Sequence, residues 1–264
     1  MTRDDGAGRG ILPWIIPAAC IAGWTFVSAG GLAPAYLLPH PADIGRAGYA
    51  YILGEPGSAP YAGRCFMDVK ASLARVSLGF AIAALTGTPL GILSGRVSAV
   101  HRLLSGTINA VRAVPGIAWL PLALVWFGIG MKTTVFLVAL AAFFPVYLNA
   151  AAGARQVDIR LLQAGAMMGT GRLRGTFAIL VPGAMPHIIT GLRLGLGISW
   201  AYLVLGELTG VPNGLGAVIM DARMLGRIDI IIVGIIMIAA LGQVSDQILK
   251  QLMRICFKSA RRTA

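Results

Sequence analysis

Charged residues are scarce in this chain, and acidic residues are fewer than basic ones. Charged residues account for 12% of the 264 positions, ten positions are Asp or Glu, and 57% of the sequence is hydrophobic. An enzyme embedded in a membrane needs titratable groups gathered at one depth. Glu207 and Asp246 are the acidic residues in apolar context, and we expect them near opposite membrane faces. The sequence offers no catalytic cluster, so a membrane-embedded enzyme or a non-transporting scaffold is the weaker alternative from another class.

Metal-ligand and nucleotide-binding motifs are also missing. The three cysteines and three histidines lie apart, without the spacing of a metal site, at Cys20, Cys65, Cys256, His40, His101 and His187. The phrase GIGMKTT at 128–134 resembles a phosphate-binding loop, but Met131 separates Gly130 from Lys132, and such a loop needs Gly and Lys adjacent. We expect Lys132 at the outer end of a helical hairpin instead. If ATP powers this protein, a partner subunit must bind it, and the chain itself holds no cofactor.

Long apolar runs dominate what is present. A membrane-spanning helix needs about 20 residues, so 264 residues with short connections accommodate roughly six spans. The apolar blocks place these spans at 11–32, 73–95, 107–127, 133–153, 188–209 and 229–249. The first block is too long for a signal peptide and follows Asp4 and Asp5, so we expect it to be retained. The sequence predicts an all-α integral membrane protein with a single transmembrane domain over residues 1–264.

The net charge of +12 is compatible with a nucleic-acid partner, but its distribution favours a membrane protein. With the N-terminus inside, most of the 22 Lys and Arg residues lie in the two tails and in the connections after the second and fourth spans. The cytoplasmic segments of membrane proteins carry such an excess. We therefore expect a multi-pass protein with both termini in the cytoplasm, contact with membrane lipid, and no nucleic-acid partner.

Small residues recur at helical spacing in two predicted spans. The second span has Gly79, Ala83, Gly87, Gly91 and Gly95, and the fifth has Gly191, Gly195 and Ser199. Such stripes let helices approach closely, so we favour helix packing over a glycine-lined path, either between these two helices or against neighbours. Pro115, Pro121 and Pro145 interrupt the third and fourth spans, and prolines tend to kink membrane helices. Bent helices suit a gate but are also common in ordinary membrane bundles.

The longest outer connection covers residues 33–72. Its phrase LPHPADI at 38–44 predicts an extended entry followed by a short amphipathic piece. The phrase EPGSAPYAG at 55–63 is typical of a solvated loop tip. We expect this connection to lie against the membrane surface.

A glycine-punctuated, arginine-bearing segment separates the fourth and fifth spans. Asp158 can cap a short helix with apolar residues at helical spacing, and Gly169-Thr170-Gly171 then breaks the chain. A second short helix is expected from near Thr170 to just before Pro182. Its exposed side would carry Arg172 and Arg174, and its other side Leu173, Phe177 and Leu180. Two such helices form a protrusion that suits either an interfacial membrane anchor or a docking surface for another subunit.

The stretch from Gln163 to Pro182 resembles the cytoplasmic signature of the permease subunits of type I ABC importers. That signature is Glu-Ala-Ala, three free positions, Gly, nine free positions and Ile-x-Leu-Pro. Every interval matches here, as Gln163-Ala164-Gly165, Gly169 and Ile179-Leu180-Val181-Pro182. Three identities differ, since Gln163 replaces the glutamate, Gly165 the second alanine and Val181 the leucine. Glutamine keeps the shape and hydrogen bonding of glutamate but not its charge, so an ionic docking contact is not available there.

The resemblance covers residues 11–255 and narrows to the branch that serves nitrate, sulfonate, taurine and bicarbonate. The phrases that carry it are YLLPHPADI at 36–44, LPLALVWFGIG at 120–130, FFPVYLNAAAGAR at 143–155, GLRLGLGISWAYLVLGEL at 191–208 and NGLGAVIMDAR at 213–223. It implies a type I importer permease fold with cytoplasmic coupling helices in a bacterial inner membrane. It also implies a homodimer of permeases, ATPase subunits beneath it, and a periplasmic or lipid-tethered solute-binding protein above it. The implied substrate is a small anion, namely an aliphatic sulfonate, taurine or nitrate, and another small solute such as a thiamine precursor is the alternative.

The resemblance also implies roles for particular residues. Residues 158–185 would be the coupling segment, docked on the ATPase through Gln163, Ala164, Gly165, Gly169, Ile179 and Pro182. The candidates for a translocation path or gate are Arg75, Arg112, Asn149, Arg193, Trp200 and Glu207. The three arginines lie towards helix ends, where long side chains reach the membrane interface, so anchoring is favoured over a path role. Glu207 would repel an anion, and we expect it to pair with Arg75 in one conformation as a gate or helix lock.

Overall fold

The computed structural model describes residues 8–31, 34, 37–55, 57–58 and 60–256. Every regular element in these ranges is a helix, as expected where lipid leaves no partner for unpaired backbone groups. The predicted all-α class is therefore confirmed. The ends of the chain, on which the predicted cytoplasmic placement of both termini rests, lie outside the described residues, as do Leu32 and Tyr36. Two compact units are distinguished and described separately, Met1–Phe66 with Val218–Ile235, and Met67–Ala217 with Ile236–Ala264.

The first unit contains α1 (Gly8–Ala29), α2 (Pro41–Leu53) and the first turns of α11 (Ile228–Cys256). Pro41 opens α2, and the His40 ring caps it by accepting a hydrogen bond from the Ala42 N–H at 3.2 Å. One face of α2 is buried, through Ile44, Ala47 and Tyr51. The short amphipathic piece predicted after residue 38 is therefore confirmed.

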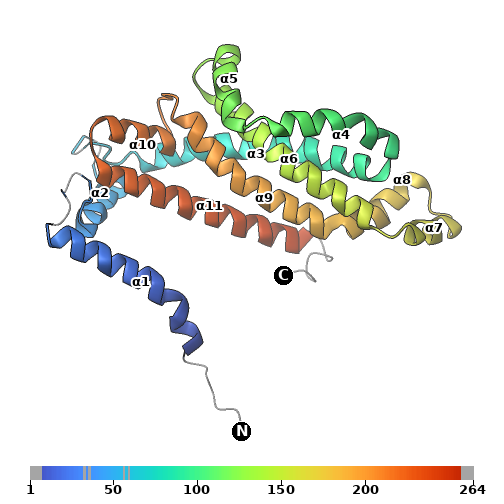
Figure 1. Ribbon diagram of the computed structural model, residues 1–264, viewed down its shortest axis with the longest axis horizontal. Coiled ribbons are helices and arrows are strands. Elements are labelled where there is room, and N and C mark those ends of the chain that lie inside the picture. The colour runs from blue at the N-terminus through green and yellow to red at the C-terminus, as the bar shows by residue number, and fades with distance from the viewer. Residues whose placement is uncertain (1–7, 32–33, 35–36, 56, 59, 257–264) are drawn as a thin grey trace, which may run out of the picture. The chain divides into compact units, whose positions relative to one another are not determined.

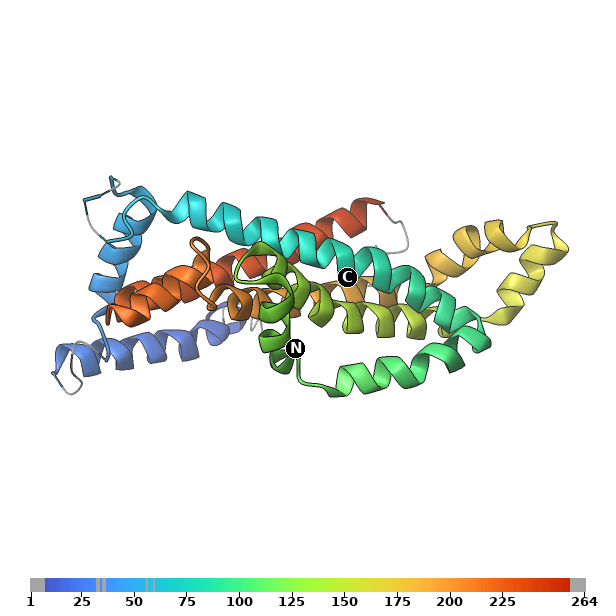
Figure 2. The same cartoon turned by 90° about the horizontal axis from the view of Figure 1, so that it is seen from above.

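The second unit is built around α6 (Met131–Gln156), which lies between α3 (Cys65–Arg96) and α9 (Val181–Glu207) (Figure 1; Figure 2). A Cβ on Gly91 would stand 2.5 Å from the Tyr147 carbonyl of α6, and one on Gly79 would stand 2.6 Å from Val138. The small residues of α3 thus bring its backbone against α6, and the packing role predicted for this stripe is confirmed.

The fifth-span stripe packs against the same helix from another side. A Cβ on Gly191 would lie 2.7 Å from that of Asn149, and one on Gly195 would lie 2.9 Å from Val146. Around these contacts α6 and α9 share a core of buried residues that includes Val146, Ala150, Ala184, Ile188 and Leu192. Both stripes therefore pack against α6. Pro145 lies inside this helix without ending it.

The predicted third span, 107–127, is interrupted at Pro115 as predicted, and its first helix begins earlier than predicted. The helix α4 (Ser98–Ala113) ends before Pro115, and η1 (Gly116–Trp119) and α5 (Leu120–Phe127) continue after a bend of 88°. Proline disfavours the helical region for the residue before it, and Val114 is extended with ψ 121°. The following hairpin from α5 to α6 was predicted, and Thr133 closes it by donating to the Gly128 carbonyl.

Among the described residues, four helices are long and apolar enough to cross a membrane, or five if the bent pair counts as one span. They are α3, α6, α9 with the turns before it, and α11. A shorter apolar stretch, Ile15–Ala29, lies in α1. The predicted count of six is thus not confirmed, and single-domain organisation stays a prediction. The helix α10 (Leu215–Met224) lies in a connection where no helix was predicted.

Candidate functional site

The segment between α6 and α9 begins as predicted. Asp158 accepts a hydrogen bond from the Arg160 N–H at 2.9 Å and caps α7 (Ile159–Met167). In both overall views α7 and the turn after it extend beyond the end of α6 (Figure 1; Figure 2). We call residues 158–180 the protrusion.

A defined turn ends α7. The Thr170 N–H donates to the Gly165 carbonyl at 2.9 Å, and the Gly169 N–H donates to the Ala166 carbonyl at 3.0 Å. This pair of bonds is a Schellman motif, which needs a left-handed residue at its centre, and Gly169 has φ +81°. Gly169 is therefore required by the backbone of the turn, whatever else it contacts.

The second half of the protrusion differs from the prediction. The short helix α8 (Arg172–Gly175) passes through a π-helical turn, η2 (Thr176–Leu180), directly into α9, so no helix ends before Pro182. In this turn the Val181 N–H bonds to the Thr176 carbonyl five residues back. The change of register places Pro182 in the first turn of α9, where a missing N–H costs no helical bond. The second half of the protrusion, from Arg172 onward, and α9 are consequently one continuous helical path.

The six predicted coupling residues occupy different environments. Gln163, Ala164 and Gly169 are exposed, Ile179 and Pro182 are half-buried, and Gly165 is buried. A Cβ on Gly165 would stand 2.5 Å from Ile179 Cδ1, so these two residues hold the halves of the protrusion together. The exposed residues of this set remain accessible to another protein.

Large apolar side chains are exposed on the protrusion. Met167 and Met168 are 85% and 86% exposed, and Leu173 and Phe177 are 79% and 71% exposed. The prediction placed Leu173, Phe177 and Leu180 on the side opposite the exposed arginines, but of these three only Leu180 is buried. Clustered exposed apolar side chains mark a surface that another molecule covers.

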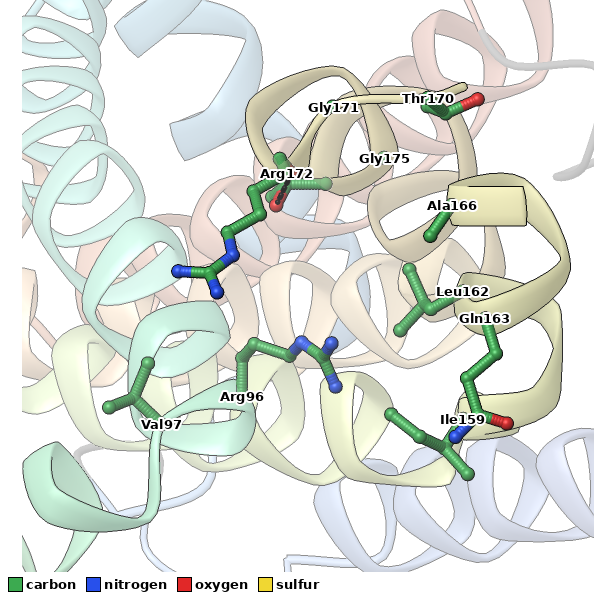
Figure 3. A pocket seen from close by; sticks show the side chains of 11 residues that line it. Arg96, Val97, Ile159, Leu162, Gln163, Ala166, Thr170, Gly171, Arg172 and Gly175 are labelled. Atoms are coloured by element: carbon green, nitrogen blue, oxygen red, sulfur yellow. Dashed lines mark hydrogen bonds between the residues drawn. The ribbon is translucent and has the colours of Figure 1, made fainter. Parts of the chain in front are cut away.

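A hollow of about 630 Å³ lies beside the exposed face of α7. Arg96 at the end of α3, Arg172 at the start of α8 and Gln163 of α7 line it together (Figure 3). The predicted docking residue Gln163 therefore lines the same hollow as two basic side chains. Such a hollow suits an acidic or polar side chain of a partner.

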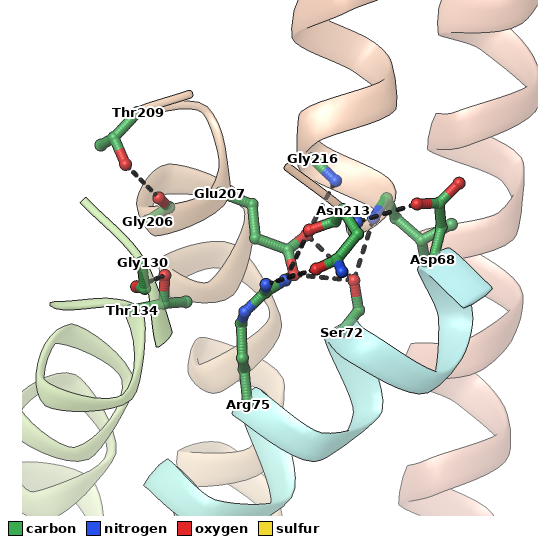
Figure 4. A network of polar contacts seen from close by, with 12 residues as sticks. Asp68, Ser72, Arg75, Gly130, Thr134, Gly206, Glu207, Thr209, Asn213 and Gly216 are labelled. Atoms are coloured by element: carbon green, nitrogen blue, oxygen red, sulfur yellow. Dashed lines mark hydrogen bonds and ion pairs between the residues drawn. The ribbon is translucent and has the colours of Figure 1, made fainter. Parts of the chain in front are cut away.

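At the other end of α9, the structure pairs Arg75 with Glu207 as predicted. Arg75 Nη1 lies 2.7 Å from Glu207 Oε1, with side-chain exposures of 7% and 0% (Figure 4). The Ser72 hydroxyl lies 2.8 and 2.9 Å from the two carboxylate oxygens. Interfacial anchoring is therefore wrong for Arg75, whose guanidinium is enclosed by protein.

The connection before α10 completes this network. Arg75 donates to the Asn213 carbonyl and to Asn213 Oδ1, both at 2.7 Å, and the Gly216 N–H donates to Glu207 Oε2 at 2.8 Å. The Gly214 N–H donates to Asp68 at 3.0 Å. Gly214 has φ +126°, and a Cβ there would meet the Glu207 carboxyl at 2.5 Å, so only glycine fits. One carboxylate thus ties α3 and α9 to the first turn of α10.

Two other path candidates join α9 to α11. Arg193 makes a two-pronged contact with Asp246, at 2.8 Å through each nitrogen, and its side chain is 43% exposed. Trp200 is 5% exposed, and its indole N–H donates to Ser245 at 2.9 Å. Both side chains therefore connect helices in this conformation.

The remaining path candidates are Asn149 of α6 and Arg112 of α4. Asn149 donates its amide to the Pro145 carbonyl at 2.8 Å within α6. Arg112, at the end of α4, lines a cavity with residues of η1, α6 and α9. In the described part of the chain the guanidinium of Arg112 has no hydrogen-bond or ion-pair partner.

Sequence reasoning missed the polar residues that complete these contacts. Asp68, Ser72 and Arg75 are spaced by four and three residues on one face of α3, a pattern that can be read from the sequence. A second missed group lies at the other end of α3, where Tyr147 donates to Ser94 at 2.7 Å. No local pattern indicates that group, because its members come from separate helices.

Comparison with known proteins identifies the family. Residues 87–254, well over half of the chain, match the family model described as "Binding-protein-dependent transport system inner membrane component". The matched region includes the bend after α4, the protrusion and α9. The predicted permease family is therefore confirmed.

Several relatives match over most of both chains. A putative aliphatic sulfonates transport permease protein, SsuC of Bacillus subtilis, is 34% identical over 91% of this chain and 84% of its own length. The taurine transport system permease protein TauC of Escherichia coli is 34% identical, with 88% and 82% covered. The nitrate import permease protein NrtB of a Synechocystis strain is 30% identical, with 90% and 86% covered.

A solved structure shares the fold. The structure titled as an inward-facing conformation of the MetNI methionine ABC transporter aligns with a TM-score of 0.60 at 18% identity, covering 74% of this chain and 98% of the other. At this identity the likeness concerns the fold alone. Together with the family model and the relatives, it shows that the chain belongs to the binding-protein-dependent transport system inner membrane components, multi-pass permease subunits of ABC importers that work with a solute-binding protein and with separate ATPase subunits.

Proposed function

We propose that this permease forms the translocation path for a small anion, with an aliphatic sulfonate or taurine as the first choice and nitrate as the second. The names of three relatives that match over more than four fifths of this chain support this range of substrates. A fixed cation in the membrane region, Arg112 beside a cavity, suits a negatively charged solute.

The protrusion is the proposed docking surface for the ATPase. Its exposed apolar residues, Met167, Met168, Leu173 and Phe177, form the kind of patch that a protein partner covers. Gln163 and the hollow beside it offer polar contacts without a charge at position 163 itself. Gly165 and Ile179 pack against each other beneath this surface, and Gly169 forms the exposed turn. Ala164 and Pro182 flank the surface.

Movement of the docked protrusion would reach the membrane through α9. The path from Arg172 through η2 to Glu207 is unbroken helix, and packed helices shift as units rather than deforming gradually. Glu207 stands at the far end of this path and holds Arg75 of α3. We therefore propose the pair of Arg75 and Glu207 as a clasp that fixes one conformation, with Arg193 and Trp200 carrying the movement of α9 to α11.

The proposed assembly contains two copies of this chain, two ATPase subunits and a solute-binding protein. Both termini would face the cytoplasm, with the protrusion on the same side. The chain would bind no cofactor, and ATP would be used by the partner subunits. Residues 1–264 would form one transmembrane domain.

The substrate is tested by reconstituting the full complex in proteoliposomes with its solute-binding protein. Ethanesulfonate, taurine, nitrate and a thiamine precursor are added in turn while ATP hydrolysis and uptake are measured. We expect stimulation by a sulfonate or by nitrate and none by the thiamine precursor. Stimulation by the thiamine precursor alone, or by none of the anions, would contradict the proposal.

A further inference from the structure

A second cavity, of about 480 Å³, lies at the bend between α4 and η1. Its lining includes Arg112 of α4, Trp119 of η1, Phe144 of α6, and Ile198 and Tyr202 of α9. This volume falls within the range of pockets that hold small ligands, about 300–1,000 Å³. The cavity is separate from the docking hollow beside α7 and from the clasp of Arg75 and Glu207.

The broken helix creates the cavity. Pro115 ends α4, and the 88° bend turns the chain away from the line that a continuous span would fill. Gly116 then lets the Tyr202 ring pass close to the backbone, since a Cβ at this position would overlap the Tyr202 hydroxyl. The sequence at the bend thus leaves an open space and places a phenol against it.

The charge of the lining has one sign. Arg112 is the charged member, and none of the described lining residues is acidic. Its guanidinium has no ion-pair partner in the described ranges, whereas Arg75 and Arg193 are both paired with carboxylates. Arg112 is exposed and lines the cavity, so its guanidinium is available to bind an anion there.

The rest of the lining is apolar and aromatic. Leu140, Phe144 and Ile198 offer hydrocarbon surface, while Trp119 and Tyr202 combine a ring with a hydrogen-bond donor. Nitrate has no group that would use the hydrocarbon surface. Taurine carries an ammonium that no acidic lining residue receives. An alkanesulfonate fits both the charged and the apolar part of the lining, with its sulfonate on Arg112 and its alkyl tail against the apolar side chains.

We infer that this cavity is a binding site, on the translocation path, for an anion with a short uncharged apolar tail, of which alkanesulfonates are the transported case. This inference rests on the proposed function and narrows it, because it ranks alkanesulfonates above taurine and nitrate. A lipid shares the same chemistry, an anionic head with an apolar tail, so the experiment must separate the two sources.

The first experiment measures uptake by the complete complex in proteoliposomes, with solute-binding protein in excess so that capture does not limit the rate. Arg112→Gln is expected to lower the maximal rate of ethanesulfonate uptake by about tenfold, and Arg112→Lys by less, because lysine keeps the charge but not the two-pronged contact. Arg102→Gln, another exposed arginine on the same helix that does not line the cavity, is the matched control and is expected to stay within about twofold of the wild type.

Basal ATP hydrolysis shows whether each variant has assembled. Failure of the wild type to import any sulfonate or nitrate would contradict the proposed function itself. If the wild type imports ethanesulfonate and Arg112→Gln behaves like Arg102→Gln, the binding site is overturned while the proposed function stands.

A second experiment detects the ligand in place and needs no transport. Ala201→Cys lines the cavity in a chain whose Cys20, Cys65 and Cys256 are replaced by serine, and its reaction with a maleimide is timed in nanodiscs of zwitterionic lipid. Butanesulfonate is expected to slow labelling by about threefold or more, nitrate and taurine less, and Arg112→Gln to abolish the protection. Equal protection by nitrate, or protection by anionic lipid with none by butanesulfonate, would overturn the inference.

Discussion

The buried ion pair of Arg75 and Glu207 is held by more than its two charges. The Glu207 carboxylate also accepts from the Gly216 N–H, and the Ser72 hydroxyl lies beside both of its oxygens. Removing one partner of a buried pair leaves the other charge without compensation, which costs about 3–5 kcal/mol. The network should therefore determine how firmly α3 and α9 are joined.

Replacement of Glu207 tests this network. Glu207→Ala is expected to lower the thermal stability of the purified complex strongly and to abolish coupled uptake, since it leaves the buried Arg75 without its counter-charge and the Gly216 N–H without its acceptor. Glu207→Gln keeps an acceptor and should cost less. The control is Asp229→Asn, which removes a partly exposed local pair with Arg227 and should cost about 1 kcal/mol or less. Equal stability of Glu207→Ala and the control would refute the account.

Exchanging the charges of Arg75 and Glu207 is a poor test of their pairing, although it is the test that the sequence suggests. An arginine at position 207 would face the Gly216 N–H and the Ser72 hydroxyl, and a carboxylate at position 75 would face the Asn213 carbonyl. Donors would then face donors at position 207, and an acceptor would face an acceptor at position 75. We expect the exchange to restore little stability even though the pair exists.

The sequence predicted the pair but not its surroundings. Arg75 and Glu207 stand out because charges in apolar segments are rare. Asn213 and Gly216 act through a connection whose backbone conformation depends on the packed helices, so no local pattern reveals them. Ser72 lies one helical turn before Arg75, and this spacing can be recognised in advance.

Among the helices, the two predicted least well are those with a break. The third span is interrupted at Pro115 as predicted, because proline disfavours a helical Val114, but its predicted start at residue 107 lies inside α4, which begins at Ser98. The second helix of the protrusion was ended too early at Pro182, because a π-helical turn can carry a proline into the first turn of the next helix. The apolar runs predicted α3, α6, α9 and α11 well, since length and hydropathy decide spans.

The turn after α7 provides a prediction at the scale of the element. Gly169→Val is expected to disrupt the Schellman motif and reduce ATPase assembly, because a β-branched residue is strained at φ +81°. Gly169→Asn should assemble nearly normally, since asparagine tolerates this region. ATPase co-purification and permease stability measure the two effects. If Asn impairs assembly as much as Val while the permease stays stable, Gly169 contacts the ATPase directly rather than shaping the turn.

For the whole molecule, the protrusion and the clasp lie at opposite ends of α9 within the second unit. The family model and the relatives show a permease of an ABC importer. In the account proposed above, the ATPase moves the protrusion, α9 carries the movement, and the contacts of Glu207, Arg193 and Trp200 pass it to α3 and α11. The exposed apolar patch of the protrusion must then be the site where the ATPase binds.

The most direct measurement is ATPase co-purification and ATP-driven uptake by the double variant Met167→Glu with Leu173→Glu. Both side chains are largely exposed, so the permease should insert and fold, while two charges in the docking patch should abolish ATPase binding and uptake. Met224→Glu, 77% exposed on α10, should leave ATPase binding intact. Retention of the ATPase and of ATP-driven uptake by the double variant would contradict the account.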